Sequence, residues 1–160
     1  MGDILEESYE IRWAEKEDWQ TTMDLVWKTF MEFEAADYTE EGITNFHDFI
    51  SNGKIYHMFE NGTYPMLVAC RPGRIIGQIS VRNRNHISLL FVDKAYHRKG
   101  VGRALMNRMG EFLKNECGEA FMSVMAAPYA IGFYRKCGFH VCGPEKEYAG
   151  IRVMPMEKFL

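Results

Sequence analysis

The chain has 160 residues, of which 47% are hydrophobic, 14% aromatic and 26% charged, a composition typical of one globular domain over residues 1–160. No apolar run approaches the roughly 20 residues that a membrane-spanning helix needs, so no membrane partner is expected. The net charge is −3, and no basic stripe is interleaved with aromatic residues, which argues against nucleic acid as a partner.

The charges are unevenly distributed along the chain. Residues 1–50 hold most of the acidic side chains, whereas residues 51–160 hold most of the basic ones. A basic carboxyl-terminal half suits a phosphate-rich ligand, and an acidic amino-terminal half could attract a cationic amine. The acidic residues could equally do no more than solubilise two exposed helices.

The first ten residues, the metal-ligand spacings and the cysteines argue against a secreted protein, a metal site and disulfide bonds. The first ten residues, MGDILEESYE, contain no apolar segment of the kind found in secretion signals, which favours a cytoplasmic location. No group of His, Cys, Asp and Glu has metal-ligand spacing, so we expect no metal site. The cysteines show no C-x-x-C spacing and are expected to be reduced: Cys70, Cys117, Cys137 and Cys142.

The amino-terminal part of the chain predicts one strand followed by two helices. Apolar residues alternate over 8–14, as in a strand, and then recur at helical spacing from about residue 19 to residue 33. Asp18 is expected to cap the first helix, and Thr39 to begin a second one that ends before Gly53.

The remaining elements alternate in type. Pro72-Gly73 connects the two strands of a hairpin, and Pro128 fits the first turn of a short helix that ends at Gly138. A long helix is expected from residue 101 to about residue 117. The predicted strands are 66–70, 75–81, 87–92, 120–126, 139–142 and 151–156. This order predicts an α/β fold, a mixed sheet with helices on both faces and a right-handed crossover between its central pair of strands.

A basic loop with two glycines connects the strand 87–92 to the long helix. A helix start exposes unpaired N–H groups and the positive end of the helix dipole. Gly100 and Gly102 carry no side chain that would keep an anion away, and Arg98, Lys99 and Arg103 add positive charge. The loop is therefore predicted to bind phosphate, or else to be a glycine-rich turn that caps an ordinary helix.

Two other nucleotide-binding loops do not match. The P-loop pattern G-x-x-x-x-G-K-[ST] is absent from the sequence. The dinucleotide fingerprint needs a third glycine where Leu105 stands, which argues against a nicotinamide-dependent oxidoreductase.

Two segments resemble the signatures of GNAT-type N-acetyltransferases. His97-Arg98-Lys99-Gly100-Val101-Gly102 resembles the acetyl-CoA-binding motif Q/R-x-x-G-x-G/A, with His97 in the first position. Residues 130–139 resemble the pattern A-x-x-F-Y-x-x-x-G-F, with Ala127 where family members often carry Asn. The two motifs occur in the family's order and at its usual separation, so the resemblance covers nearly the whole chain.

The resemblance implies a fold and a binding mode for acetyl-CoA. It also implies a homodimer, an assembly common in the family. It implies a mostly antiparallel sheet whose central parallel strands splay apart, with acetyl-CoA in the gap between them. Backbone groups of Leu90, Phe91 and Val92 would pair with the pantetheine arm. The other residues expected to bind acetyl-CoA are His97, Arg98, Lys99, Gly100, Val101, Gly102, Arg103, Ala104, Phe133 and Tyr134.

Acetyl transfer to an amine needs two proton movements. An alkyl amine with a pKa near 10.4 is mostly charged at pH 7, and removing its proton costs about 4.6 kcal/mol. His86 is the candidate base, because it begins the strand where many relatives place Glu, and it could instead be an exposed histidine. Tyr134, from the second motif, is the candidate acid for the departing thiolate, and it could instead be a half-buried aromatic residue.

The sequence therefore predicts an N-acetyltransferase that moves an acetyl group directly from acetyl-CoA to a primary amine in a ternary complex. The acidic amino-terminal half favours a small cationic amine as acceptor. The alternative is a regulatory module that binds acetyl-CoA without turnover.

Overall fold

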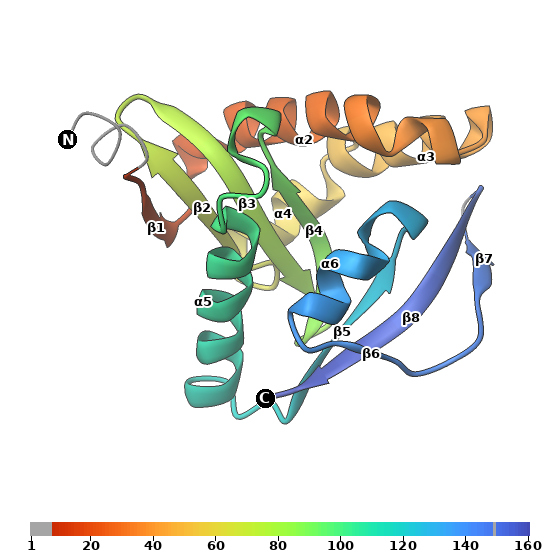
Figure 1. The fold of residues 1–160 in the computed structure, drawn as a ribbon. Coiled ribbons are helices and arrows are strands. Elements are labelled where there is room, and N and C mark those ends of the chain that lie inside the picture. The colour runs from red at the N-terminus through yellow and green to blue at the C-terminus, as the bar shows by residue number, and fades with distance from the viewer. Residues whose placement is uncertain (1–7, 149) are drawn as a thin grey trace.

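The computed structural model describes residues 8–148 and 150–160 (Figure 1). The predictions for the first seven residues lie outside this part of the chain. The strands are β1 (Glu10–Trp13), β2 (Met66–Arg71), β3 (Arg74–Arg82), β4 (His86–Val92), β5 (Phe121–Ala126), β6 (His140–Val141), β7 (Lys146–Tyr148) and β8 (Ile151–Phe159). The helices are α2 (Trp19–Phe33), α3 (Glu40–Ser51), α4 (Lys54–Glu60), α5 (Val101–Asn115) and α6 (Ile131–Lys136), with 3-10 turns η1 (Lys16–Asp18), η2 (Ala35–Asp37), η3 (Lys94–Tyr96) and η4 (Pro128–Ala130).

The strands form one sheet in the order β1-β2-β3-β4-β5-β8-β6, with β7 paired to β8. Neighbouring strands are antiparallel except β4 and β5, which are parallel. The predicted fold class, a mixed and mostly antiparallel sheet with a central parallel pair, is therefore confirmed. Two elements were not predicted, the short helix α4 and the three-residue strand β7.

Two hydrophobic cores cover the two faces of the sheet. The stripe of α5, which includes Val101, Leu105 and Met109, packs on one face together with α6. Side chains of α2, among them Val26 and Phe30, pack on the other face together with residues of α3 and α4. Figure 1 shows α5 and α6 on the opposite side of the sheet from α2, α3 and α4.

A β-bulge interrupts β4 at Ser88. Ser80 of β3 lies opposite Leu89, but the next residue, Val81, lies opposite Ile87, so Ser88 is an extra residue in β4. In a regular strand, residues two apart point to the same face. Here Ile87 joins the core beneath α5, whereas Leu89 joins the core beneath α2. After the bulge, the side chains of β4 therefore point to the opposite faces of the sheet from those that a regular strand would give them.

The pairing between β4 and β5 ends at this bulge. Only two residue pairs join the strands, His86 with Ser123 and Ile87 with Val124. A bulge bends its strand and often terminates pairing. The residues of β4 beyond Ile87 therefore present an edge that β5 does not cover, and the predicted splay of the central strands is present.

Three hydroxyl groups hold the bulge in place. Ser80 Oγ donates to the Tyr64 hydroxyl at 3.0 Å, and the Tyr64 hydroxyl donates to Ser88 Oγ at 2.8 Å. Tyr64 is fully buried. Because Ser80 and Ser88 lie on either side of the register shift, Tyr64 connects the two strands at the point where their regular ladder is interrupted.

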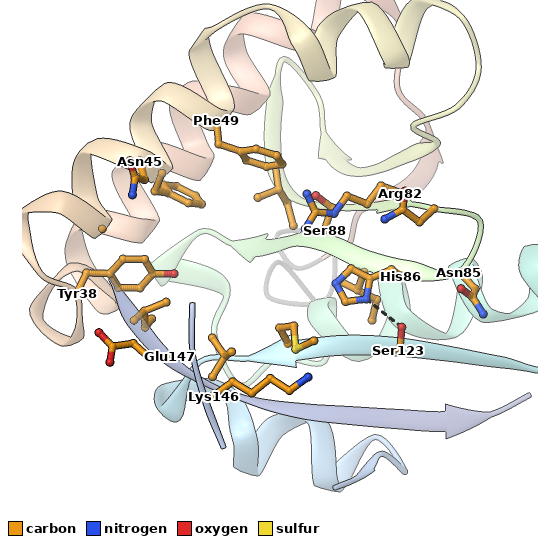
Figure 2. A pocket seen from close by; sticks show the side chains of 18 of the residues that line it. Tyr38, Asn45, Phe49, Arg82, Asn85, His86, Ser88, Ser123, Lys146 and Glu147 are labelled. Atoms are coloured by element: carbon orange, nitrogen blue, oxygen red, sulfur yellow. Dashed lines mark hydrogen bonds between the residues drawn. The ribbon is translucent and has the colours of Figure 1, made fainter. Parts of the chain in front are cut away.

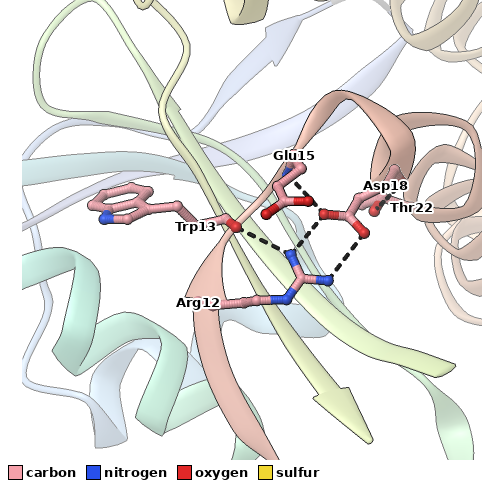
Figure 3. A network of polar contacts seen from close by, with 5 residues as sticks. All are labelled: Arg12, Trp13, Glu15, Asp18 and Thr22. Atoms are coloured by element: carbon pink, nitrogen blue, oxygen red, sulfur yellow. Dashed lines mark hydrogen bonds and ion pairs between the residues drawn. The ribbon is translucent and has the colours of Figure 1, made fainter. Parts of the chain in front are cut away.

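The expected cap of α2 has a different role. Asp18 does not cap α2 with its side chain, because its carboxylate accepts hydrogen bonds from both Nη atoms of Arg12, at 2.7 and 3.1 Å (Figure 3). It also accepts the Glu15 N–H at 2.7 Å. The bond to Arg12 lowers the pKa of Asp18. This network attaches the edge strand β1 to the start of α2.

We expect Tyr64→Phe to lower the free energy of unfolding by about 1–3 kcal/mol, because it leaves the buried Ser80 hydroxyl and the half-buried Ser88 hydroxyl without their partner. Denaturant titration measures the change. Tyr56→Phe is the matched control, since the Tyr56 hydroxyl makes no hydrogen bond that involves the described residues, and it should change stability by less than about 0.5 kcal/mol. Equal effects of the two substitutions would show that the hydroxyl chain does not stabilise the fold.

Candidate active site

A cavity of about 830 Å³ lies beside the bulge, between α3, the β3–β4 turn, β5 and the β7–β8 hairpin (Figure 2). Much of its wall is apolar. Polar side chains stand at both ends: Figure 2 shows Tyr38 and Glu147 at one end and Arg82, Asn85 and His86 at the other. The lining residues used below are Tyr38, Phe46, Phe49, Arg82, His86, Ser88, Leu89, Ser123, Met125, Lys146 and Glu147.

His86, the candidate base, lines this cavity. Its Nδ1 lies 2.9 Å from Ser123 Oγ, across the last pairs that join β4 to β5. Burial first, and then the positive charge of Arg82, lower the pKa of His86 from its usual 6.5. The imidazole is therefore mostly neutral at pH 7, which is the state that can accept a proton.

Tyr134, the candidate acid, lies elsewhere. It belongs to α6 and packs edge-on against the rings of Phe133 and Phe139, with centroids 5.3 and 5.2 Å away. It is buried in the core beneath α5, and it is not one of the residues that line the cavity. Burial raises the pKa of Tyr134, and the charge of Glu34 raises it further. The phenol therefore keeps its proton at physiological pH and can act as a donor.

The loop before α5 presents backbone donors. Arg98 and Gly100 have left-handed φ angles of 61° and 83°, and Gly100 is the N-cap of α5 with no side-chain hydrogen bond at the cap. The first helical bond joins the N–H of Ala104 to the carbonyl of Gly100 at 2.9 Å, so the N–H groups before it have no partner within the helix. A Cβ at Gly100 would meet nothing within 4 Å. This geometry suits the predicted phosphate site.

Gly102 has a packing role in addition to the predicted access for an anion. A Cβ at Gly102 would lie 3.2 Å from two carbons of the Phe133 ring. The glycine therefore lets the second motif pack against the first. Arg103, predicted to add charge to the phosphate site, donates from Nη2 to the Lys136 carbonyl at 2.8 Å and so also connects α5 to α6.

Two backbone groups predicted to contact pantetheine are bonded to side chains. The N–H of Phe91 donates to Gln78 Oε1 at 3.1 Å. His97 Nε2 donates to the carbonyl of Val92 at 2.6 Å, so His97 closes the loop back onto the end of β4. The structure thus brings the predicted binding residues of β4, the loop and α6 to one region, while His86 lies on the cavity side of the bulge.

Glu34 is a candidate that the sequence analysis missed. It follows α2, and burial first, then the charge of Asp37, raise the pKa of Glu34 to about 7. Its charge in turn raises the pKa of Tyr38 and Tyr134, which places the carboxyl near both. No motif marks this position, since Glu34 is one of many acidic residues in its segment, and its burial arises from tertiary packing.

Comparison with known proteins agrees with this geometry. A family model described as "Acetyltransferase (GNAT) domain" matches residues 34–160, which include both motifs. The chain belongs to the GNAT acetyltransferase family. The recognition made from the two motifs is therefore confirmed, and acetyl-CoA is the cosubstrate. No curated protein matches the chain.

Several solved structures share the fold. A GCN5-related N-acetyltransferase from Rhodopseudomonas palustris is 22% identical, with a TM-score of 0.82 and 96% of each chain covered. The PaiA N-acetyltransferase of Thermoplasma acidophilum, in complex with coenzyme A, is 22% identical, with a TM-score of 0.78 over 96% of this chain and 99% of that one. A spermidine N-acetyltransferase from Vibrio cholerae is 15% identical, with a TM-score of 0.66 over 94% of this chain and 93% of that one.

The residues present fit acetyl-CoA. The edge of β4 beyond Ile87 is not covered by β5, and a thioester arm could pair with it. The exposed residues Arg98, Lys99 and Gly100 stand at the start of α5, where a diphosphate could accept from backbone N–H groups.

Three further features concern the described residues only. Within them, no group of three or more His, Cys, Asp or Glu side chains could hold a metal ion. No helix in this part of the chain is long and apolar enough to cross a membrane. The cysteines are free thiols, with Cys70 and Cys137 buried and Cys117 and Cys142 exposed.

We expect Gly100→Ala to weaken acetyl-CoA binding about tenfold, which corresponds to about 1.4 kcal/mol. A Cβ disfavours the left-handed φ at this position, and relaxation of the loop would turn the helix N–H groups away from the diphosphate. Gly132→Ala in α6 is the control, because its Cβ would meet nothing within 4 Å and its φ is not left-handed. Calorimetric titration with acetyl-CoA measures both, and equal affinities of the two variants would contradict this binding site.

Proposed function

We propose that the protein transfers the acetyl group of acetyl-CoA directly to a primary amine held in the cavity, with both substrates bound together. The observation that carries this proposal is the bulge at Ser88. Ser88 and Leu89 line the cavity, and they also begin the edge of β4 that β5 leaves uncovered. An amine in the cavity would therefore meet a thioester on that edge.

The chain offers binding groups for acetyl-CoA on the side of α5. The edge formed by Leu90, Phe91 and Val92 would pair with the pantetheine arm, for which the Phe91 N–H would exchange its bond to Gln78 Oε1 for one to the arm. The loop around Arg98 and Gly100 would hold the diphosphate. Acetyl-CoA supplies an acetyl group activated as a thioester.

His86 would take the proton from the amine. For Nε2 to accept it, Nδ1 must carry the hydrogen and donate to Ser123 Oγ, which lies 2.9 Å away and can accept that bond. The lowered pKa of His86 keeps the ring neutral at pH 7. Because His86 lines the cavity, the base would act on an acceptor bound there rather than on the cosubstrate.

Tyr134 would give a proton to the sulfur as the carbon–sulfur bond breaks. A phenol with a raised pKa stays protonated until a stronger base, the developing thiolate, comes within reach. Because Tyr134 packs on α6 beneath the start of α5, it lies on the side of the fold that would hold the pantetheine.

Mass-spectrometric detection of acetylated product, with acetyl-CoA and a panel of amines, tests the proposal. Product formation supports it. Tight binding of acetyl-CoA with no product from any amine supports the alternative, a regulatory module without turnover.

We expect Tyr134→Phe to lower kcat by about 10²- to 10⁴-fold, the range typical of general acid catalysis, with the affinity for acetyl-CoA unchanged. Tyr129→Phe is the matched control, since it removes the hydroxyl of an exposed tyrosine five residues earlier, and it should alter kcat less than about twofold. Wild-type turnover by Tyr134→Phe, with acetyl-CoA still bound, would exclude Tyr134 as the acid.

The pH dependence of kcat/KM for the amine tests His86. In the wild type, kcat/KM should be level at neutral pH and fall as the pH drops through the pKa of His86, below 6.5, because protonated imidazole accepts no proton. In His86→Gln the amine must lose its proton in solution, so kcat/KM should rise about tenfold per pH unit toward pH 10.4.

Glu34→Gln separates the two candidate bases. We expect it to keep the wild-type profile. The contrary result would be a fall of the wild-type kcat/KM below about pH 7 that disappears in Glu34→Gln and persists in His86→Gln. That result would assign the base to Glu34, whose pKa is raised to about 7.

A further inference from the structure

The charges inside the cavity differ from those expected from the sequence. Apart from His86, the charged lining residues are Arg82, Lys146 and Glu147, two cations and one anion. The residues from the first fifty that line the cavity include no acidic side chain. Within the part of the amino-terminal half that the structure describes, no acidic wall faces the cavity, and a purely cationic amine would meet more positive than negative lining residues.

Arg82 differs from four other arginines of the chain, which pair with a carboxylate. Arg12, Arg74, Arg84 and Arg152 each pair with an Asp or Glu. Among the described residues Arg82 has no such ion pair, and its Nε is buried without any hydrogen-bond partner. A partly buried guanidinium without a carboxylate partner is unfavourable, and the carboxylate of a ligand could supply that partner.

The surroundings of Arg82 orient it for a ligand. Its guanidinium lies over the Phe49 ring, 5.4 Å from the centroid, and Figure 2 shows it at the same end of the cavity as Ser88 and His86. Packing on an aromatic face limits the motion of the guanidinium, and Arg82 lines the cavity. A guanidinium edge matches the two oxygens of a carboxylate.

The pairing of β3 with β4 relates Arg82 to the candidate base. Arg82 and His86 are directly opposite residues of these antiparallel strands, and side chains in such positions are neighbours on one face. In an α-amino acid the amine is on the carbon next to the carboxylate. A carboxylate bound by Arg82 would therefore place the α-amine beside His86.

On the basis of the function proposed above, we propose that the acceptor is a free α-amino acid with an apolar side chain, and that Arg82 binds its carboxylate. The apolar side chain would lie against Phe46, Phe49 and Met125 in the cavity wall. Lys146 adds positive potential that attracts the carboxylate. Glu147 lies at the far end with Tyr38, so it does not compete for Arg82.

Matched amines that differ only in the carboxylate test this proposal. We compare phenylalanine with phenethylamine, and leucine with 3-methylbutylamine, at pH 8, where His86 is neutral with or without the Arg82 charge. The expected result is a preference in kcat/KM of roughly 10- to 100-fold for the amino acid of each pair, the range for a charge-assisted hydrogen bond. Arg82→Gln should remove this preference, and Arg82→Lys should restore part of it.

Arg84→Gln is the matched control. Arg84 is two residues further along the chain, pairs with Glu119 at 2.9 Å and does not line the cavity, so the preference should remain. Thermal unfolding and acetyl-CoA titration of each variant confirm that the fold and the cosubstrate site persist. Equal kcat/KM values within each pair, or a preference for spermidine or phosphoethanolamine over phenylalanine, would overturn the proposed acceptor while leaving acetyl transfer intact.

A binding measurement keeps the two proposals separable. Calorimetry of phenylalanine and phenethylamine with the protein–CoA complex does not depend on turnover. If no amine is acetylated, the proposed function fails, whereas binding of phenylalanine that is lost in Arg82→Gln still supports the amino-acid site. Absence of such Arg82-dependent binding overturns it.

Discussion

The β-bulge at Ser88 is the constraint on which the rest of the structure depends. One extra residue in β4 ends the pairing with β5 after two residue pairs and turns Leu89 and Phe91 toward the core beneath α2. Regular pairing along the whole length of β4 would fill the gap and close the edge that a thioester needs. The buried hydroxyl of Tyr64 fixes the bulge at a single position by bonding to a serine on each strand. A local irregularity of the backbone thus creates the place where two substrates can meet.

The two motifs are one physical unit, although they are about thirty residues apart. Gly102 lets the ring of Phe133 approach α5, and Arg103 donates to the last residue of α6. The loop that presents N–H groups to an anion is therefore held by the same contacts that position Tyr134 in the core. This contact explains why the motifs carry more information together than either does alone, since each supplies the surface against which the other packs.

The fold could be predicted because it follows from periodicity and order. Alternation and helical stripes located most elements, and the basic glycine loop pointed to the cosubstrate side. The details that shape the acceptor side could not be predicted in this way. Ser88 is a single polar residue in an apolar strand, and only the register with β3 shows that it is a bulge. Asp18 bonds to Arg12 instead of capping α2, and Glu34 and Arg82 gain their importance from partners, or a lack of partners, that tertiary packing decides.

The charge of a segment is a poor guide to the potential inside a cavity, and Arg82 shows why. Burial lowers the pKa of His86 most and the positive charge of Arg82 lowers it further, which keeps the base neutral but also makes it weaker. A carboxylate bound to Arg82 would offset that second contribution, so the pKa of His86 would rise as the acceptor arrives, although burial would still hold it below the usual value. An amine without a carboxylate would leave the base in its weaker state. On the proposed acceptor, therefore, a single ion pair would both orient the α-amine and strengthen the group that deprotonates it, and recognition of the acceptor would be coupled to catalysis through two opposed residues of β3 and β4.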